Sequence, residues 1–412
     1  MARPGSALKN IALVIVSVAV GLGVTLALDR LIVSSWLAPP PLPDSIELLF
    51  PPGSKHEHKT VDFHYVERIN RLGLRDEEIA TEPSDAVRIL AIGDSYTFGW
   101  GVDLEDTWLN QLEENLEAAG HDVETINMGK PGAGPPDYAE FAETAIPLLE
   151  PDLVIVGMLL GNDLAAAGEE KSPSPGAAAA SLMQWFYPNT MRWLRDLRRN
   201  RDFAGRTEEM TPPQTSTAED NRRWKANRAK EFYDDNWSEE QRARFDALDT
   251  EVKEAFLSGN LNPYLIDLAL QNPKFYEVTI DLEDPWTQTC IERVGSHLAR
   301  VRHVAQQYDA KAVVVTIPEG VYVNEHALRN IRRIGYDVPG TLLESNAPDE
   351  GVRRASEAAG LPFHTVTGAF RSQRSNPEFF FELDGHLTAK GHAFYADAIT
   401  PHIEPYVAGA SE

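Results

Sequence analysis

Two segments of this sequence, far apart along the chain, carry side chains suited to nucleophilic catalysis. In GDSYTFGWGV, Ser95 follows directly on the apolar run VRILAIG. In FELDGHLTAKGH, near the end of the chain, Asp384 and His386 lie two residues apart. A serine hydroxyl activated by an imidazole, which a carboxylate orients, attacks ester and amide carbonyls. We therefore predict Ser95 as nucleophile, His386 as general base and Asp384 as the residue that orients the imidazole.

Two further segments offer hydrogen-bond donors for the negative oxygen that such an attack creates. NMGKPGAGPPD contains Gly132, whose backbone N–H can approach a ligand closely, and LLGND contains Asn162, with its side-chain amide. Together with the backbone N–H of Ser95, these donors predict an oxyanion hole. Taken singly, each segment is also an ordinary turn, and Ser95 alone is a common type of helix cap.

The segments that must position these residues alternate between strand and helix patterns. Buried strands are predicted at 87–93, 123–129 and 152–161, with helices at 107–120 and 135–150 between them. A strand at 310–318, a weaker one at 361–366 and a closing helix at 393–403 follow. This order predicts a three-layer α/β/α fold with a mostly parallel central sheet. Each motif follows a predicted strand or precedes the closing helix, and ligands of parallel sheets bind at the carboxyl ends of the strands.

Changes in composition divide the chain into five predicted regions. Residues 1–35 form an N-terminal cytoplasmic tip and transmembrane anchor, and residues 36–86 a proline-rich spacer with an N-terminal extension. The first part of the core spans 87–164 and the second part 287–412. Between them, residues 165–286 lose the strand pattern and predict a mainly helical insertion, either a set of solvated helices or a lid over the site.

An uncharged apolar segment near the N-terminus is long enough to cross a bilayer. It runs from Ile11 to Leu28, 18 residues that would span about 27 Å as a helix. Arg3 and Lys9 precede it, so the excess of basic residues places the short N-terminus in the cytoplasm. We expect a single-pass membrane protein with its catalytic domain outside the cytoplasm, periplasmic or extracellular. A cleaved signal peptide is the alternative.

Composition excludes several classes of partner and site. Acidic residues outnumber basic ones 63 to 38, and the resulting charge of -25 argues against nucleic acid. The single cysteine, Cys290, excludes a disulfide framework and has the apolar surroundings of a buried thiol. Asp384, His386 and His392 also have side chains of the types that bind metals. A metal site is a weaker interpretation than catalysis, because no histidine pair at positions i and i+4 of a helix occurs elsewhere to complete it. We expect no metal and no cofactor.

In their order along the chain, GDSYTFGWGV, NMGKPGAG, LLGND and DGHLTAKGH resemble the four sequence blocks of the SGNH (GDSL-like) hydrolases. The resemblance implies the same nucleophile and base as above, with Gly132 and Asn162 as oxyanion donors. One departure concerns the acid, which many members carry three residues before the histidine. That position is Leu383 here, so Asp384 is assigned from its own spacing to His386. The resemblance leaves a second arrangement open, a serine–histidine dyad helped by a backbone carbonyl, in which Asp384 is dispensable and Ser95 and His386 are not.

The resemblance implies hydrolysis of an ester, for example an O-acetyl group on an envelope carbohydrate. The expected partners are a small-molecule or carbohydrate ester and, through the N-terminal helix, a membrane. The main alternative is an O-acyltransferase that uses the same residues and a sugar hydroxyl as acceptor. A catalytically inactive binding protein is the third interpretation, which the complete set of Ser95, Gly132, Asn162 and His386 disfavours.

Overall fold

The computed structural model describes residues 16–17, 20–33, 45–79, 85–168 and 215–408, together with residues 183, 186–187, 189–191 and 194. It divides the chain into two compact units. The smaller unit comprises residues 1–41 and 171–210, and the larger unit comprises residues 42–170 and 211–412. All candidate site residues belong to the larger unit.

A five-stranded parallel sheet forms the centre of the larger unit, in the order β4–β3–β5–β7–β8. The strands are rich in valine, isoleucine and leucine and are buried on both faces, as expected where helices cover both faces of a parallel sheet. The predicted α/β/α fold class is therefore confirmed. The strand order is that of flavodoxin-like folds, which bind ligands between the first and third strands. The strands are β3 (Val87–Gly93), β4 (Val123–Gly129), β5 (Leu153–Leu159), β7 (Lys311–Ile317) and β8 (Phe363–His364).

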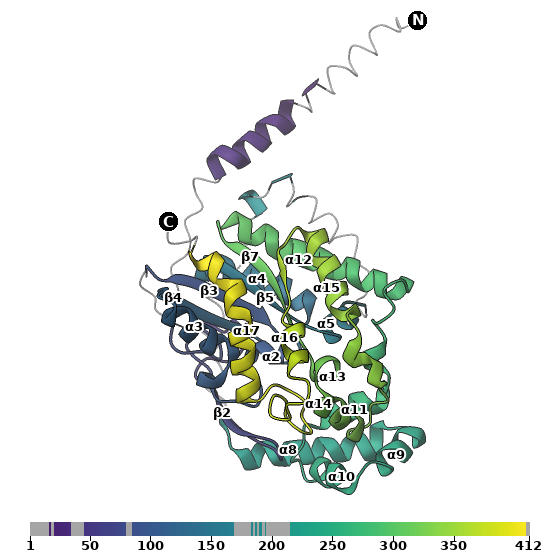
Figure 1. Ribbon diagram of the computed structural model, residues 1–412. Helices are drawn as coiled ribbons and strands as arrows, with labels where there is room; N and C mark the ends of the chain where they lie inside the picture. The colour runs from purple at the N-terminus through teal and green to yellow at the C-terminus, as the bar shows by residue number, and fades with distance from the viewer. Residues whose placement is uncertain are drawn as a thin grey trace, which may run out of the picture. The chain divides into compact units, whose positions relative to one another are not determined.

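Helices cover both faces of the sheet (Figure 1). On one face, α3 (Trp108–Ala118) packs against α17 (Ala389–Ala408), burying a stripe of leucines at helical spacing. On the other face, α12 (Pro285–Gln307) packs against α4 (Pro135–Leu149), α5 (Asn162–Gly168) and α15 (Ala347–Ala359). The shorter helices are α2 (Ser95–Phe98), η3 (Leu104–Asp106), α13 (Gly320–Val323), α14 (Glu325–Arg333), η6 (Gly340–Glu344) and α16 (Thr367–Ser372).

The described part of the predicted insertion is almost entirely helical. Side-chain oxygens cap its four longer helices at their N-termini, as the sequence pattern of Thr, Ser, Asp and Asn before each helix favours. Between the helices, Phe232, Trp237, Phe245 and Phe256 form a buried aromatic cluster. The elements are β6 (Thr215–Ser216), α8 (Ala218–Glu231), η4 (Phe232–Asn236), α9 (Glu239–Asp246), α10 (Thr250–Leu257), α11 (Pro263–Gln271) and η5 (Phe275–Glu277).

The segment before the first core strand folds onto the larger unit. It forms an antiparallel hairpin of β1 (Lys55–Lys59) and β2 (His64–Arg68), and β6 pairs with β1. Residues 45–53, predicted as part of the spacer, are docked: Ile46 is buried and its N–H donates to Arg71 O at 2.9 Å. These residues therefore do not form a free-standing linker, and residues 36–44 lie outside the described residues.

Within the smaller unit, the described residues 20–28 are helical and continue into η1 (Asp29–Val33). The buried Asp29 carboxylate accepts hydrogen bonds from the backbone N–H groups of Asn189 and Thr190. The predicted membrane segment, Ile11 to Leu28, lies partly outside the described residues. Among those that are described, no helix has the length and apolarity needed to span a membrane.

Candidate active site

Ser95, His386 and Asp384 form a continuous chain of hydrogen bonds. Ser95 Oγ lies 2.8 Å from His386 Nε2, and His386 Nδ1 lies 2.5 Å from Asp384 Oδ1. The first contact joins residues 291 positions apart in the sequence. The structure thus brings together all three residues predicted as nucleophile, base and orienting acid. Glu382, the other nearby acid, instead pairs with Arg333.

Ser95 lies at the carboxyl end of β3 because the chain turns there from strand into the short helix α2. The Asp94 side chain caps this helix by accepting the Tyr96 N–H at 2.9 Å. The turn requires glycine at position 93, since a Cβ there would lie 2.1 Å from Thr97 Oγ1. Ser95 is therefore the first residue of α2, and its backbone N–H has no intrahelical partner.

Asp384 is held in place by groups from outside its own segment. Its side chain is buried, and Trp100 Nε1 donates to Asp384 Oδ2 at 3.4 Å. Asp62, in the turn between β1 and β2, accepts the backbone N–H groups of Leu383 at 2.9 Å and Asp384 at 2.8 Å. The N-terminal hairpin thus positions the loop that carries the acid and the base.

The electrostatic surroundings of His386 favour its protonated form. Burial lowers the pKa of the imidazole, but Asp384, with smaller contributions from Asp94 and Glu319, outweighs burial and raises the pKa above its usual value. Tyr96 lies beside the imidazole, with ring centroids 4.7 Å apart, and its hydroxyl donates to Gly385 O at 3.1 Å. A base in this setting holds a proton strongly once it has taken one.

The predicted oxyanion donors line the same cavity as Ser95. Gly132 adopts a positive φ of 79°, which favours glycine, and a Cβ at this position would meet no atom within 4 Å. Neither the Gly132 N–H nor the Asn162 side-chain amide donates to another described residue. These groups are free to bind a ligand. Their role as an oxyanion hole stays a prediction.

The cavity around Ser95 and His386 has a volume of about 500 Å³. Its near wall consists of the strand-end segments that hold Ser95, Gly132 and Asn162. Much of the remaining lining, called the far wall below, comes from α11 and η5 of the insertion and from α14 and the residues that follow it in the core. Most of the far wall is apolar or aromatic: Tyr264, Leu265, Leu268, Phe275, Tyr276, Ile331, Ile334 and Tyr336.

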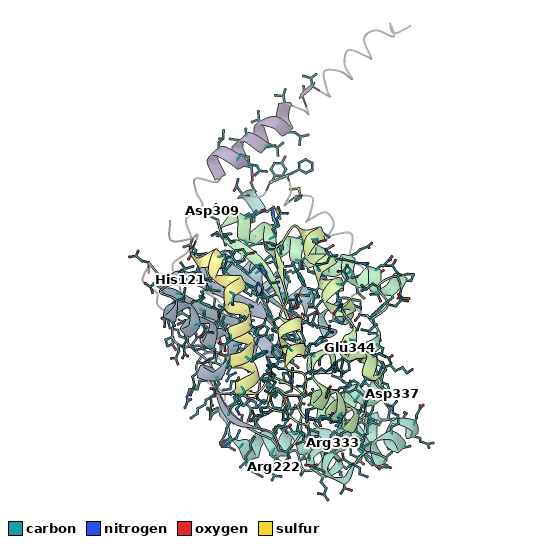
Figure 2. All side chains as sticks on the ribbon, in the orientation of Figure 1. His121, Arg222, Asp309, Arg333, Asp337 and Glu344 are labelled. Atoms are coloured by element: carbon teal, nitrogen blue, oxygen red, sulfur yellow. The ribbon has the colours of Figure 1, made fainter. Side chains whose placement is uncertain are left out.

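An ion cluster links the insertion to the catalytic loop. Arg333, at the end of α14 and labelled in Figure 2, pairs with Asp249 at 3.0 Å and Glu251 at 2.6 Å, both at the start of α10. The same guanidinium pairs with Glu382, two residues before Asp384. Arg333 therefore connects α14 and α10 to the loop that carries His386.

Several buried carboxyl groups surround the site. Burial raises the pKa of Asp94 to about 6 and that of Glu319 to about 8. Asp163, directly after Asn162, accepts the Tyr138 hydroxyl at 3.1 Å and the Leu159 N–H at 2.8 Å, and burial raises its pKa well above the usual value. Asp163 therefore fixes the turn that presents Asn162.

Two other sequence predictions concern His392 and Cys290. His392 is buried, and its Nδ1 accepts the Trp108 backbone N–H at 3.1 Å. Burial lowers the pKa of His392 to about 3, so it is a neutral structural residue rather than a partner of Asp384. Cys290 is buried, as predicted, and burial raises the pKa of its thiol to about 11.

Sequence comparison gives one family match. The model of the GDSL-like lipase/acylhydrolase family matches residues 91–269, which include Ser95, Gly132 and Asn162. This match supports membership of the GDSL-like acylhydrolases. It ends before His386, so the link between the histidine and the serine rests on the structure. No curated protein matches the sequence.

Solved structures with low sequence identity align over most of the chain. The lipase/acylhydrolase from Enterococcus faecalis is 12% identical, and its alignment covers 77% of this chain and 95% of the Enterococcus chain, with a TM-score of 0.37. The esterase EstA from Pseudoalteromonas sp. is 10% identical, with coverages of 78% and 98% and a TM-score of 0.35. The acetyl xylan esterase AlAXEase is 11% identical, with coverages of 77% and 100% and a TM-score of 0.36.

Sequence reasoning did not identify three residues that shape the site: Asp62, Trp100 and Glu319. Trp100 lies inside the first motif, but nothing local shows that its indole reaches Asp384. Asp62 gives no sequence signal, because its partners are 321 and 322 residues away. Glu319 follows a predicted strand directly, which is the one signal that could have marked it.

Proposed function

We propose that the protein is a serine esterase in which Ser95 is the nucleophile. The observation that carries this proposal is the pair of contacts that joins Ser95 Oγ through His386 to Asp384 in one cavity. The match to the acylhydrolase family supports the same reaction class. No second set of residues along the cavity combines a hydroxyl with an imidazole among the described residues.

In the proposed reaction, His386 Nε2 takes the proton of Ser95 Oγ as the oxygen attacks the ester carbonyl carbon. The Ser95 and Gly132 N–H groups and the Asn162 amide hold the resulting oxyanion. The C–O bond to the leaving alcohol then breaks, and His386 gives its proton to that oxygen. Water attacks the acyl-enzyme with His386 again as base, and the acid leaves as Ser95 regains its proton.

Asp384 acts in this scheme by orientation and charge. Its carboxylate accepts the Nδ1–H of His386, which leaves Nε2 as the acceptor that faces Ser95. The same negative charge stabilises the imidazolium that forms during attack. Trp100 and Asp62 keep the carboxylate and its backbone in the position that this task requires.

Hydrolysis of a chromogenic acetyl ester by the full chain tests the proposal. Ser95→Ala is expected to lower kcat by about 10⁴ to 10⁶-fold, because the nucleophile is lost. Ser372→Ala, at an exposed serine on α16, is the matched control and should keep full activity. Equal activity of the Ser95→Ala variant and the wild type would refute the proposal. Release of free acetate with a sugar acceptor present distinguishes an esterase from an acyltransferase.

A further inference from the structure

Glu319 lines the cavity but takes no part in the proposed proton transfers. It follows β7 at the carboxyl edge of the sheet and lines the same cavity as Ser95 and His386. The Tyr276 hydroxyl donates to Glu319 Oε1 at 2.7 Å. Glu319 Oε2 is buried and has no hydrogen-bond partner among the described residues. One side of this carboxyl group is thus unpaired.

The unpaired oxygen carries a proton near neutral pH. Burial raises the pKa of Glu319 to about 8 against the opposing effects of Tyr276 and His386, and Asp94 raises it further. Since Tyr276 donates its own hydrogen to Oε1, the carboxyl proton belongs on Oε2. A buried donor without an acceptor is unfavourable, so an acceptor supplied by a ligand would be bound there.

Two side-chain amides on the far wall of the cavity are also unpaired. Asn272 ends α11, Asn330 lies on α14, and both line the cavity. Neither side-chain amide forms a hydrogen bond to another described residue. Each amide offers both donors and an acceptor, which is the combination that hydroxyl groups require.

The charged residues of the cavity restrict its ligand further. Its lining contains no lysine or arginine among the described residues. Besides the protonated Glu319, it contains the acidic residues Asp94, Glu382 and Asp384. A phosphate or carboxylate on the substrate would therefore meet acidic groups and no permanent cation to pair with.

We propose that Glu319, Asn272 and Asn330 bind the alcohol portion of the ester, and that this portion is neutral and carries hydroxyl groups, as in a sugar ester. The inference rests on the esterase function proposed above. A hydrocarbon chain would leave Glu319 and the half-buried Asn330 without partners once it displaced water from the cavity. A sugar ring offers oxygen atoms to them and C–H faces to the aromatic far wall, which includes Tyr264 and Phe275.

Hydrolysis of three acetyl esters by the full chain tests this inference. The substrates are an acetylated methyl glucoside, the matching acetylated methyl glucuronide, which adds one carboxylate, and a chromogenic acetyl ester without hydroxyl groups. For the wild type, kcat/KM is expected to be at least about tenfold higher for the glucoside than for the glucuronide. Glu319→Leu is expected to raise KM for the glucoside. The ratio of kcat/KM for the glucoside to kcat/KM for the chromogenic ester is expected to fall by about tenfold.

Glu319→Gln keeps a donor at the same position and is expected to restore most of that ratio. Glu240→Gln, at an exposed glutamate on α9, is the control for changes in net charge. If Glu319→Leu fails to fold in a thermal melt, Asn272→Ala provides the same test from the exposed end of the cavity.

Equal kcat/KM for the glucoside and the glucuronide would overturn the inference. It would also be overturned if the ratio of glucoside kcat/KM to chromogenic-ester kcat/KM were the same in the Glu319→Leu and Glu240→Gln variants. Failure of the esterase proposal is a separate result. It would show as chromogenic hydrolysis that is absent from the wild type or unchanged by Ser95→Ala.

Discussion

Removing the Asp62 carboxylate should impair catalysis although Asp62 itself lies outside the cavity lining. Asp62 does not line the cavity, yet it accepts the N–H groups of Leu383 and Asp384 at 2.9 and 2.8 Å. Asp62→Ala leaves both donors without this acceptor, at a cost of about 1–3 kcal/mol each. The loop can avoid that cost only by shifting, and a shift of about 1 Å in a catalytic group lowers rates by up to about 100-fold. We expect kcat to fall by about 10- to 100-fold.

The size of the effect should depend on what replaces the carboxylate. Asp62→Asn retains an oxygen acceptor but loses the charge, and neutral hydrogen bonds are worth about 1 kcal/mol less than charged ones. Its kcat is therefore expected to fall less than tenfold. KM should change less than kcat in either variant, because Asp62 itself lines no part of the cavity and acts only through the loop of Asp384.

Steady-state kinetics on the chromogenic ester, with unfolding measured in parallel, separates positioning from stability. Asp152→Ala is the matched control, since Asp152 also accepts a backbone N–H, from Arg88 at 2.8 Å, but at the amino ends of the strands. It should lower stability and leave kcat unchanged. The reasoning is refuted if Asp62→Ala folds and keeps the kcat of the wild type, or if both variants lower kcat equally.

Three further predictions concern pH, stability and location. Activity should fall as pH drops through the raised pKa of His386, because only the neutral imidazole accepts a proton. Asp384→Asn removes the charge that raises this pKa, so the acidic limb of the plot of kcat/KM against pH should move to lower pH, and kcat should fall by about 10⁴-fold. Arg75→Met should cost about 3 kcal/mol or more in denaturant unfolding, because it leaves the carbonyls of Phe98, Gly99 and Val102 without a donor, at about 1–3 kcal/mol each. A loss below about 1 kcal/mol would contradict this. We propose that the N-terminal segment anchors the chain to a membrane, with the catalytic domain outside the cytoplasm. Deleting residues 1–35 should then move the protein from the membrane fraction to the soluble fraction. An unchanged distribution between the two fractions would count against an anchor.

The core strands were predictable because their signal is local. The runs 87–93 and 123–129 coincide with β3 and β4, since buried parallel strands read as short apolar stretches between turns. The hairpin of β1 and β2 was missed because its residues, KHEHK and HYVER, are mostly polar. These strands are held by their pairing and by contacts with the core, which no local pattern reveals.

The sequence by itself determined which residues could react and the succession, along the chain, of the strands that carry them. Ser95, Gly132 and Asn162 follow three successive strands, and parallel strands bring their carboxyl ends to one edge. Only the tertiary structure decided that His386 meets Ser95, that Asp62 holds the loop of Asp384, and that Glu319 faces the same cavity. The physical reason is that periodicity and turn chemistry act over a few residues, whereas these contacts depend on how α17, the hairpin and β7 pack around one sheet.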